Sequence, residues 1–348
     1  MTSSKSQTPT ENAKGMVKAV GSGTALIEAR VTIGGNTQSD TYPVKVMPDL
    51  NLKSIALDQI PVNNFSADQH GYSFIYSNNQ ATVPVISAKQ TDENTLISVE
   101  QAESIPGTAL VHLKDSRTGE TGAYAVYFGY RAISDEFSSS NLAEHWEWVR
   151  HQQDSVYLDR GREEITIQAE TGDIEGGDND AKNLLLQSAN SDWTAETKIA
   201  FSRTPAYLGE QAGVVAFSDD DNFVKVVCKF SRGGFMGMTQ IPRFEIITET
   251  GGSGSTIASV LASDALGDDN IFFLRLRKEG SRYTAYYSSD GEHFTDLGTT
   301  DIILKDVRVG LMAVKGQKPS PRFSLFDQGN GPDHDFSSSF DYFRIESK

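Results

Sequence analysis

The sequence predicts an all-β fold, because short runs rich in β-branched and aromatic residues follow one another along almost the whole chain. Clusters of Gly, Asn, Asp and Ser separate these runs at a spacing of about 8–12 residues, which is typical of β-sandwiches. One pair of runs flanks Asp290-Gly291, a dipeptide that favours a tight hairpin turn. Helix is expected only as single turns, in SDALGD and SSNLAEHW.

The first predicted segment, residues 1–48, contains the strand-like runs ALIEARVTI and TYPVKVM and ends within VMPDLNLKS. Two or three strands are too few for an independently stable sandwich. This segment therefore either borrows a sheet edge from its neighbour or is the tail of an upstream domain.

The second segment, residues 49–131, contains ATVPVISA, ALVHLK and AYAVYFGY, and it fits a small immunoglobulin-like sandwich. GYRAISDEF separates it from the third segment, residues 132–348, whose runs extend from EITIQA to FDYFRI. The number of runs in this last segment fits a larger jelly roll of two sheets. The predicted architecture is therefore one or more immunoglobulin-like modules followed by a large β-sandwich.

Composition and charge exclude several classes of function. A net charge of -16 argues against a nucleic-acid partner, because phosphate binding needs clustered Lys and Arg. No run approaches the roughly 18 apolar residues of a spanning helix, and MTSSKSQTPTENAKG lacks the apolar core of a signal peptide. The single cysteine, Cys228, rules out an intramolecular disulfide and lies in the alternating run NFVKVVCKF, which predicts a buried thiol. These features suit a secreted or cell-surface bacterial protein that is monomeric and has no membrane partner.

Three stretches resemble modules of bacterial glycosidases. VKAVGSGTALIEARVTIGGNTQSDTYPVKVMPD is similar to the closing strands of a bacterial immunoglobulin-like domain, and SIALDQIPVNNFSADQHGYSFIY with ATVPVISA resembles a cadherin-like sandwich module. NLLLQ, WTAETKIAF and GEQAGVVAFSDDDNFVKVV resemble the concanavalin-A-like sandwich at the C-terminus of family-43 glycoside hydrolases, among them β-xylosidases and arabinofuranosidases. The resemblance implies an accessory region rather than the catalytic propeller. In relatives, this sandwich binds xylan-type chains or packs on the propeller.

The chain lacks a recognisable pair of catalytic carboxyls. The nearest candidate is RFEIITET, in which Glu245 and Glu249 flank Ile247. Residues four apart in a strand are about 13 Å apart. Retaining glycosidases need about 5–5.5 Å between their carboxyls and inverting ones about 6.5–9.5 Å. No serine-hydrolase, zinc-protease, P-loop or dinucleotide motif is present either.

Aromatic residues with polar neighbours are the expected sugar contacts, because such modules stack rings on pyranose faces and hold hydroxyls with a few polar groups. In AEHWEW, Trp146 and Trp148 share one face of a predicted strand. This face either stacks on sugar rings or packs in the hydrophobic core, and packing in the core is the favoured interpretation. Core is also favoured for Trp193. The glycine-rich loop SRGGFMGMTQIPRF is either tucked over the sandwich edge or forms a binding wall or a contact with the catalytic domain. The predicted carbohydrate-binding residues are Trp148, Arg150, His151, Tyr207, Arg232, Phe235 and Arg243.

A structural calcium ion is predicted where the first and last strands of the large sandwich meet. SDEF opens this sandwich and FDYFRIES closes it, and the resemblance implies that the two lie side by side. Calcium takes oxygen ligands from carboxylates that are often distant in sequence. The predicted ligands are Asp135 or Glu136 together with Asp341.

The sequence therefore predicts a non-catalytic region that binds a polysaccharide or oligosaccharide. It would tether a secreted glycoside hydrolase to a plant-type polysaccharide such as xylan or arabinoxylan, with the upstream catalytic domain of the same polypeptide as its partner. Two alternatives remain open. The sandwich docks on the catalytic domain without binding sugar, or it is a lectin-fold glycosidase or lyase in its own right.

Overall fold

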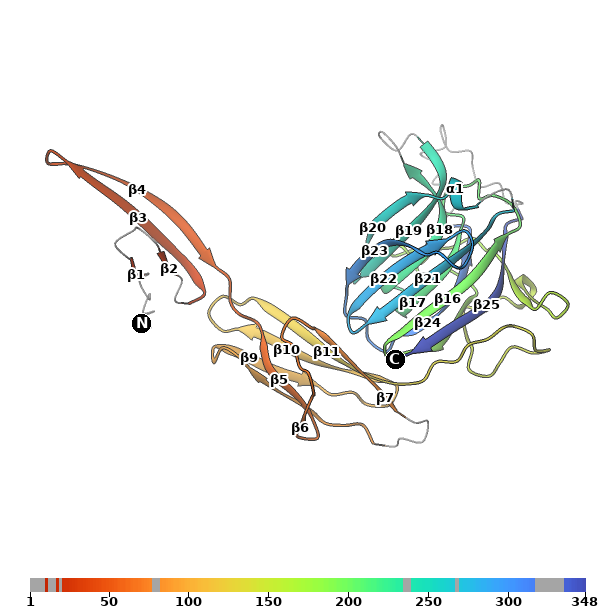
Figure 1. Ribbon diagram of the computed structural model, residues 1–348, viewed down its shortest axis with the longest axis horizontal. Helices are drawn as coiled ribbons and strands as arrows, with labels where there is room; N and C mark the ends of the chain where they lie inside the picture. Colours follow the sequence, from red (N-terminus) through yellow and green to blue (C-terminus); the bar gives the residue numbers. More distant parts are fainter. Residues whose placement is uncertain are drawn as a thin grey trace. The chain divides into compact units, whose positions relative to one another are not determined.

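The computed structural model describes residues 10–11, 17–18, 21–76, 82–233, 239–266, 269–316 and 335–348 (Figure 1). The chain forms two compact units. The first consists of Met1–His70, Pro84–Gln101 and Ala109–Tyr124, and the second of Gly71–Val83, Ala102–Thr108 and Ala125–Lys348. Within the described ranges, no helix has the length and apolar character that crossing a membrane requires. The predicted all-β fold is confirmed.

The first unit consists of small sheets. Its strands are β1 (Thr10–Glu11), β2 (Val17–Lys18), β3 (Gly23–Ile33), β4 (Asn36–Val46), β5 (Leu52–Leu57), β6 (Ile60–Pro61), β8 (Ile86–Gln90) and β9 (Thr95–Glu100). Strand β5 lies between β6 and β8, and β9 pairs with β10 (Gly107–Asp115) over Leu110–Asp115. The boundaries predicted at residues 48 and 131 stay predictions.

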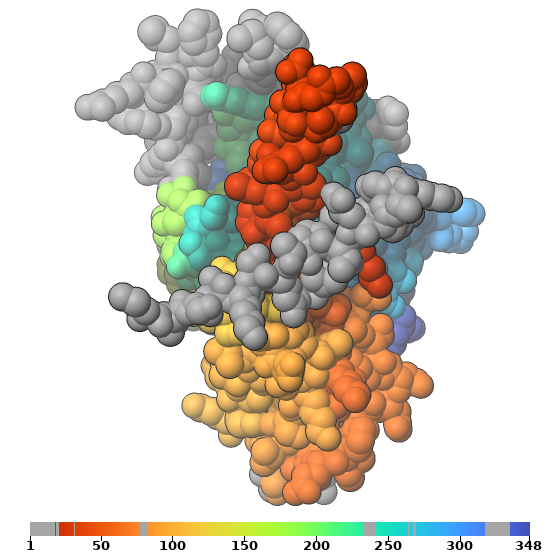
Figure 2. All heavy atoms as spheres, turned by 90° about the vertical axis from the view of Figure 1, so that its left-hand side faces the viewer, coloured from red at the N-terminus to blue at the C-terminus, as the bar shows by residue number. Residues whose placement is uncertain are grey.

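The hairpin of β3 and β4 is a two-stranded sheet, and nearly all side chains of β4 are exposed (Figure 2). Gly34 and Gly35 form its turn and both have positive φ, which matches a two-residue hairpin turn. Leu26 is 72% exposed and Ile33 is 76% exposed. A hairpin of this kind is marginal on its own, as its strand count predicted.

The second unit contains a sandwich of two seven-stranded sheets. The first, here called the β18 sheet, has the order β12 (Glu147–Val149), β15 (Leu184–Ser188), β24 (Arg308–Val314), β17 (Gln211–Asp219), β18 (Asn222–Gly233), β19 (Thr239–Thr250) and β20 (Ser253–Leu261). The second, the β16 sheet, has the order β13 (Val156–Asp159), β14 (Glu164–Gln168), β25 (Ser337–Ser347), β16 (Trp193–Phe201), β21 (Ile271–Glu279), β22 (Arg282–Ser288) and β23 (Thr295–Asp301).

Short elements complete the second unit. They are the 3-10 turn η1 (Gln153–Ser155) and the helical turn α1 (Ser263–Leu266), which lies in the predicted SDALGD. Strand β7 (Gly71–Tyr76) pairs in parallel with β11 (Thr121–Tyr130) over Ala125–Tyr130. The predicted hairpin at Asp290-Gly291 joins β22 to β23, and its loop extends from Ser288 to Thr295. Asp290 accepts hydrogen bonds from the amides of Glu292 and His293 (2.8 Å each), and these bonds hold the loop.

Alternation of side chains places the main core between the two sheets. Strand β16 alternates buried and half-buried positions, and its inward residues Trp193, Ala195 and Ile199 belong to a cluster with members from both sheets. Trp146 also belongs to this cluster, and Trp148 packs against it. The reading of these indoles as core residues is therefore the one that the structure favours.

A second apolar cluster lies on the outer face of the β18 sheet. Ile174 and Ala181, from the segment between β14 and β15, cover outward residues of the sheet such as Phe217, Phe223 and Ile247. The same face also carries the outward lysines Lys225 and Lys229 of β18, and the loop supplies their carboxylate partners. The loop therefore covers apolar and charged positions of this face together.

Candidate functional site

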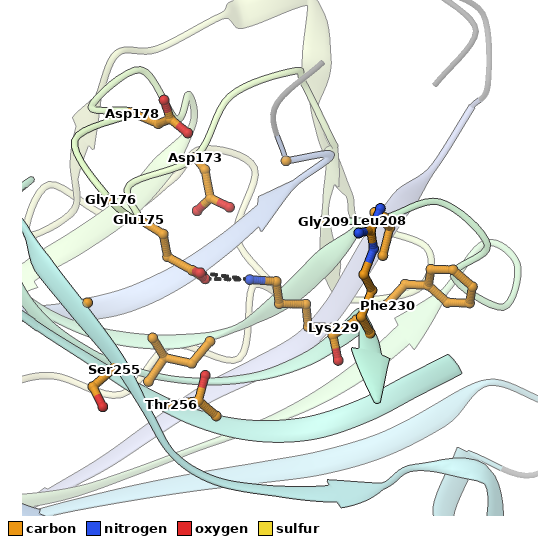
Figure 3. A pocket seen from close by; sticks show the side chains of 15 residues that line it. Asp173, Glu175, Gly176, Asp178, Leu208, Gly209, Lys229, Phe230, Ser255 and Thr256 are labelled. Atoms are coloured by element: carbon orange, nitrogen blue, oxygen red, sulfur yellow. Dashed lines mark hydrogen bonds and ion pairs between the residues drawn. The ribbon is translucent and has the colours of Figure 1, made fainter. Parts of the chain in front are cut away.

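A cavity of about 560 Å³ lies on the outer face of the β18 sheet, and we call it the β18 cavity (Figure 3). This volume falls within the roughly 300–1,000 Å³ of small-ligand sites. Figure 3 shows Glu175 and Lys229 pointing toward one another, with Ser255 and Thr256 on another strand. The lining residues come from six places in the chain: Asp173, Glu175, Gly176 and Asp178; Leu208 and Gly209; Lys229, Phe230, Ser231 and Arg232; Ile247; Gly254, Ser255 and Thr256; and Gly316.

An ion-pair network forms one wall of the cavity. The Glu175 carboxylate lies 2.7 Å from the Nζ atoms of both Lys225 and Lys229. Lys225 is fully buried, and its Nζ also lies 3.3 Å from Oδ1 of Asp173. The two lysines are four residues apart in one strand, so both side chains leave the same face of the sheet. The acidic loop after β14 reaches over that face and neutralises them.

The pKa values in this network follow from burial and charge together. Burial lowers the pKa of Lys225, but the charges of Asp173 and Glu175 outweigh burial and hold it above its ordinary value. Burial likewise raises the pKa of Glu175, and the two lysine charges more than reverse that effect. Both groups are therefore charged at neutral pH. At the rim, partial burial and then the charges of Asp173, Asp180 and Glu175 raise the pKa of Asp178.

Two buried acceptors behind the cavity wall are only partly satisfied. Glu249 accepts a hydrogen bond from the amide of Gly176 at Oε2 (2.8 Å), and Gln211 donates one to Oδ2 of Asp173 (3.0 Å). Neither Oε1 of Glu249 nor Oε1 of Gln211 has a hydrogen-bond partner among the described residues, and both side chains are fully buried. Buried acceptors without a donor are rare and costly.

The two carboxylates of β19 are held apart in different surroundings. Glu245 accepts hydrogen bonds from Ser231 and Ser259 (2.8 Å each), whereas Glu249 contacts Gly176. Strand β19 pairs with β18 without a register shift, so the spacing of about 13 Å expected for a regular strand applies. This spacing exceeds that of both hydrolytic mechanisms.

The structure brings some of the predicted sugar contacts to the β18 cavity. Arg232 lines the cavity, and Tyr207 directly precedes two lining residues. The guanidinium of Arg203 lies 5.5 Å from the centroid of the Tyr207 ring. Arg243 lies behind the wall, where it donates to Oγ of Ser259 (2.6 Å). Phe235 lies outside the described residues.

The other predicted contacts do not line this cavity. Trp148 is half-buried against the core, and its ring stacks on that of His151 with a centroid distance of 4.7 Å and an interplanar angle of 2°. Arg150 makes two hydrogen bonds to the carboxylate of Asp220 (2.8 and 2.7 Å), which engages its guanidinium. A sugar-contacting role for Trp148, Arg150 and His151 stays a prediction.

The predicted calcium ligands are each engaged by another group. Asp135 accepts hydrogen bonds from the Trp146 indole and the Phe137 amide (2.8 Å each). Glu136 is paired with Arg344 (2.8 Å), and Asp341 with Lys198.

The first and last strands do meet as expected, through backbone hydrogen bonds between Asp135 and Phe343 (2.8 Å in both directions). Among the residues that the structure describes, however, no group of three or more His, Cys, Asp or Glu is gathered as a metal site needs. Calcium binding stays a prediction that titration of EDTA-treated protein tests. A higher melting temperature on calcium addition would support it, and no heat and no rise would contradict it.

Sequence reasoning missed the main part of the cavity wall. Glu175 lies in the acidic stretch DIEGGDND, which was not singled out, and Lys225 and Lys229 lie in the strand-like run NFVKVVCKF. A signal was present, because two lysines at even spacing in an apolar run point to the same face and need anionic partners. Which loop supplies those partners is not visible in the sequence.

Comparisons with known proteins agree with the sandwich. The family of the beta xylosidase C-terminal concanavalin A-like domain matches residues 134–346. Among solved structures, the chain is similar to the GH43 protein BlXynB of Bacillus licheniformis, with 16% identity, a TM-score of 0.49, and coverage of 88% of this chain and 68% of that one. It is also similar to the xylan beta-1,4-xylosidase of Bacillus halodurans C-125, with 12% identity, a TM-score of 0.47, and coverage of 93% and 63%. No protein of curated function matches. The family match covers more than half of the chain, which therefore belongs to the family of concanavalin A-like domains found at the C-terminus of beta xylosidases.

Proposed function

We propose that this chain is a non-catalytic, carbohydrate-binding accessory region of a glycoside hydrolase, and that the β18 cavity is its sugar-binding site. The observation that carries the proposal is a ligand-sized cavity whose lining combines carboxylates, hydroxyls and the ammonium of Lys229. Sugar hydroxyls donate hydrogen bonds to such carboxylates and accept them from an ammonium.

The proposed mechanism is tethering. Weak and reversible binding to a plant-type polysaccharide, such as xylan or arabinoxylan, raises the effective concentration of the linked catalytic domain at its substrate. The family match supports a place beside a family-43 catalytic domain. We place the protein outside the cell or on the cell surface of a bacterium, where such polysaccharides are found.

Hydrolysis by this chain is not part of the proposal. Glu245 and Glu249 are too far apart in β19 for either glycosidase mechanism, as their spacing in a regular strand shows. The chain should release no reducing sugar from a broad panel of glycans. Release that is lost on substitution of Glu245 or Glu249 would show that the chain is a catalyst and would contradict the tethering proposal.

Affinity electrophoresis through gels that contain xylan, arabinoxylan, arabinan or β-glucan tests the proposal. Thr256 is exposed on β20 and lines the β18 cavity, so Thr256→Trp fills the cavity without entering the core. We expect at least one glycan to retard the wild type and Thr256→Trp to abolish that retardation. Ser253→Trp, at an exposed position of the same strand that does not line the cavity, is the matched control.

A second candidate is docking on the catalytic domain without sugar binding. Strand β20 lies at the edge of the β18 sheet and exposes Ile257 (40%) and Leu261 (52%). Apolar side chains on an exposed edge strand favour contact with another protein surface. Unretarded migration on every glycan, together with loss of a complex with the catalytic domain in Leu261→Ser, would favour docking.

A further inference from the structure

A second cavity, of about 530 Å³, lies on the outer face of the β16 sheet, which is the opposite face of the sandwich from the β18 cavity. We call it the β16 cavity. Its lining carries four cations and two aromatic rings: Arg275, Arg277, Arg344, Lys348, Tyr286 and Phe294. Only two carboxylates, Glu196 and Glu346, line it as well. This excess of positive charge contrasts with the net charge of -16 for the whole chain.

Strand register gathers these side chains. Glu196 of β16 is paired on one side with Arg275 of β21 and on the other with Arg344 of β25. Arg275 is in turn paired with Tyr286 of β22. Paired residues of neighbouring strands point to the same face, so one row of side chains crosses four strands. Two residues along β21, Arg277 extends the row in the strand direction.

Two of the arginines are already fixed in place. The guanidinium of Arg275 lies 3.6 Å from the centroid of the Phe294 ring and donates to Glu196 (3.0 and 2.6 Å). Arg344 lies 3.9 Å from the centroid of the Tyr342 ring and makes two hydrogen bonds to Glu136 (2.8 Å each). Stacking on rings and bidentate pairing order both cations before any ligand arrives.

Arg277 is different, because the structure shows no hydrogen bond from it to the described residues. Its Nε atom is buried and has no hydrogen-bond partner among the described residues. Its ion-pair contact is Oε2 of Glu279 at 3.5 Å, and that carboxylate also lies 3.5 Å from Nζ of Lys348. A guanidinium offers five N–H donors in a planar fork that matches a carboxylate. The Arg277 side chain is 35% exposed, so its fork is accessible to the carboxylate of a ligand at the wall of this cavity.

We propose that the β16 cavity binds the carboxylate of a uronic acid residue in an acidic oligosaccharide. Arg277 takes the carboxylate, and Arg275 and Arg344 supply the surrounding positive potential. Tyr286, which lies 5.8 Å from the Arg277 guanidinium, offers an aromatic ring for the apolar face of the same sugar. The site does not depend on the β18 cavity, so the chain would bind acidic sugars on one face and neutral chains on the other.

Calorimetric titration of the full chain with trigalacturonate tests this inference, with the same trisaccharide after reduction of its carboxyls to alcohols as the neutral comparison. We expect the acid form to bind about tenfold or more tightly than the reduced form, and added salt to weaken its binding. Arg277→Gln should weaken the acid form about tenfold, and Arg277→Lys less than that, because Lys keeps the charge but loses the fork. Arg282→Gln is the matched control, because Arg282 is exposed on β22 and pairs with Asp301.

Equal affinity for the acid and the reduced form, or an unchanged affinity in a folded Arg277→Gln variant, would overturn the inference. Inorganic phosphate that binds as tightly as trigalacturonate would overturn the assignment to a sugar, since the site would then hold any anion. Thr256→Trp separates the two proposals. It should leave trigalacturonate binding unchanged even though it fills the β18 cavity, so failure at one cavity says nothing about the other.

Discussion

Removal of Lys225 tests the ion-pair network on which the β18 cavity is built. Lys225 is fully buried, and Lys225→Met leaves Asp173 without a cation and Glu175 with Lys229 alone. Breaking a buried ion pair on one side costs about 3–5 kcal/mol, and we expect about 3 kcal/mol because Glu175 keeps one partner. For a unit of this size, that loss lowers the melting temperature by roughly 6–12 °C. Lys229→Met, at a partly exposed position, should cost less.

Tryptophan fluorescence is the assay, because Trp146, Trp148 and Trp193 all belong to the second unit and report its unfolding alone. Combining Lys225→Met with Asp173→Asn should restore part of the lost stability, since Glu175 keeps Lys229 and Asp173 no longer places an unpaired carboxylate in this network. A loss below about 1 kcal/mol for Lys225→Met, or no rescue in the combined variant, would refute this account of the network.

Three further predictions follow from burial and charge. Burial raises the pKa of Glu175, but its two lysine partners hold this pKa below the ordinary 4.5. The unfolded state therefore takes up the proton first, and the free energy of unfolding should fall as pH drops below about 4.5. Glu175→Gln should reduce this loss of stability at acid pH in pH-dependent denaturation. Burial raises the pKa of Cys228, so the thiol should react with a colorimetric disulfide reagent only after denaturation; fast reaction of native protein would contradict its burial. A Cβ at Gly310 would lie 1.8 Å from the carbonyl oxygen of Leu185, so Gly310→Ala should cost at least about 1–3 kcal/mol in chemical denaturation, and a stable variant would contradict the packing of β24 on β15.

Much of the large sandwich could be predicted because its strands alternate clearly. WTAETKIAF became β16 and FFLRLRK became the middle of β21, each with every second residue in the core. Strand β20 was not predicted, because SGSTIASVL is polar, contains glycine and lies at a sheet edge where few side chains are buried. A strand of this composition shows almost no alternation of apolar and polar residues.

The candidate site was less accessible to sequence reasoning. Because sugar-binding modules stack aromatic rings on sugars, the tryptophans were considered as sugar contacts. Trp146 and Trp193 are instead buried core residues, and Trp148 packs against the same core. The β18 cavity instead joins Glu175, from a loop, with Lys229 of β18. These residues are far apart in sequence, and only the folding of the loop after β14 across the sheet brings them together. Arg232 was identified because it stands at one end of the predicted glycine-rich loop SRGGFMGMTQIPRF, a local feature that the sequence does show.

Retardation of the wild type and of Thr256→Trp in the same xylan or arabinoxylan gel tests the central claim most directly, with Ser253→Trp as the control. The account predicts that the glycan retards the wild type and Ser253→Trp equally and leaves Thr256→Trp unretarded. Equal retardation of all three proteins would contradict the claim that the β18 cavity is the sugar-binding site.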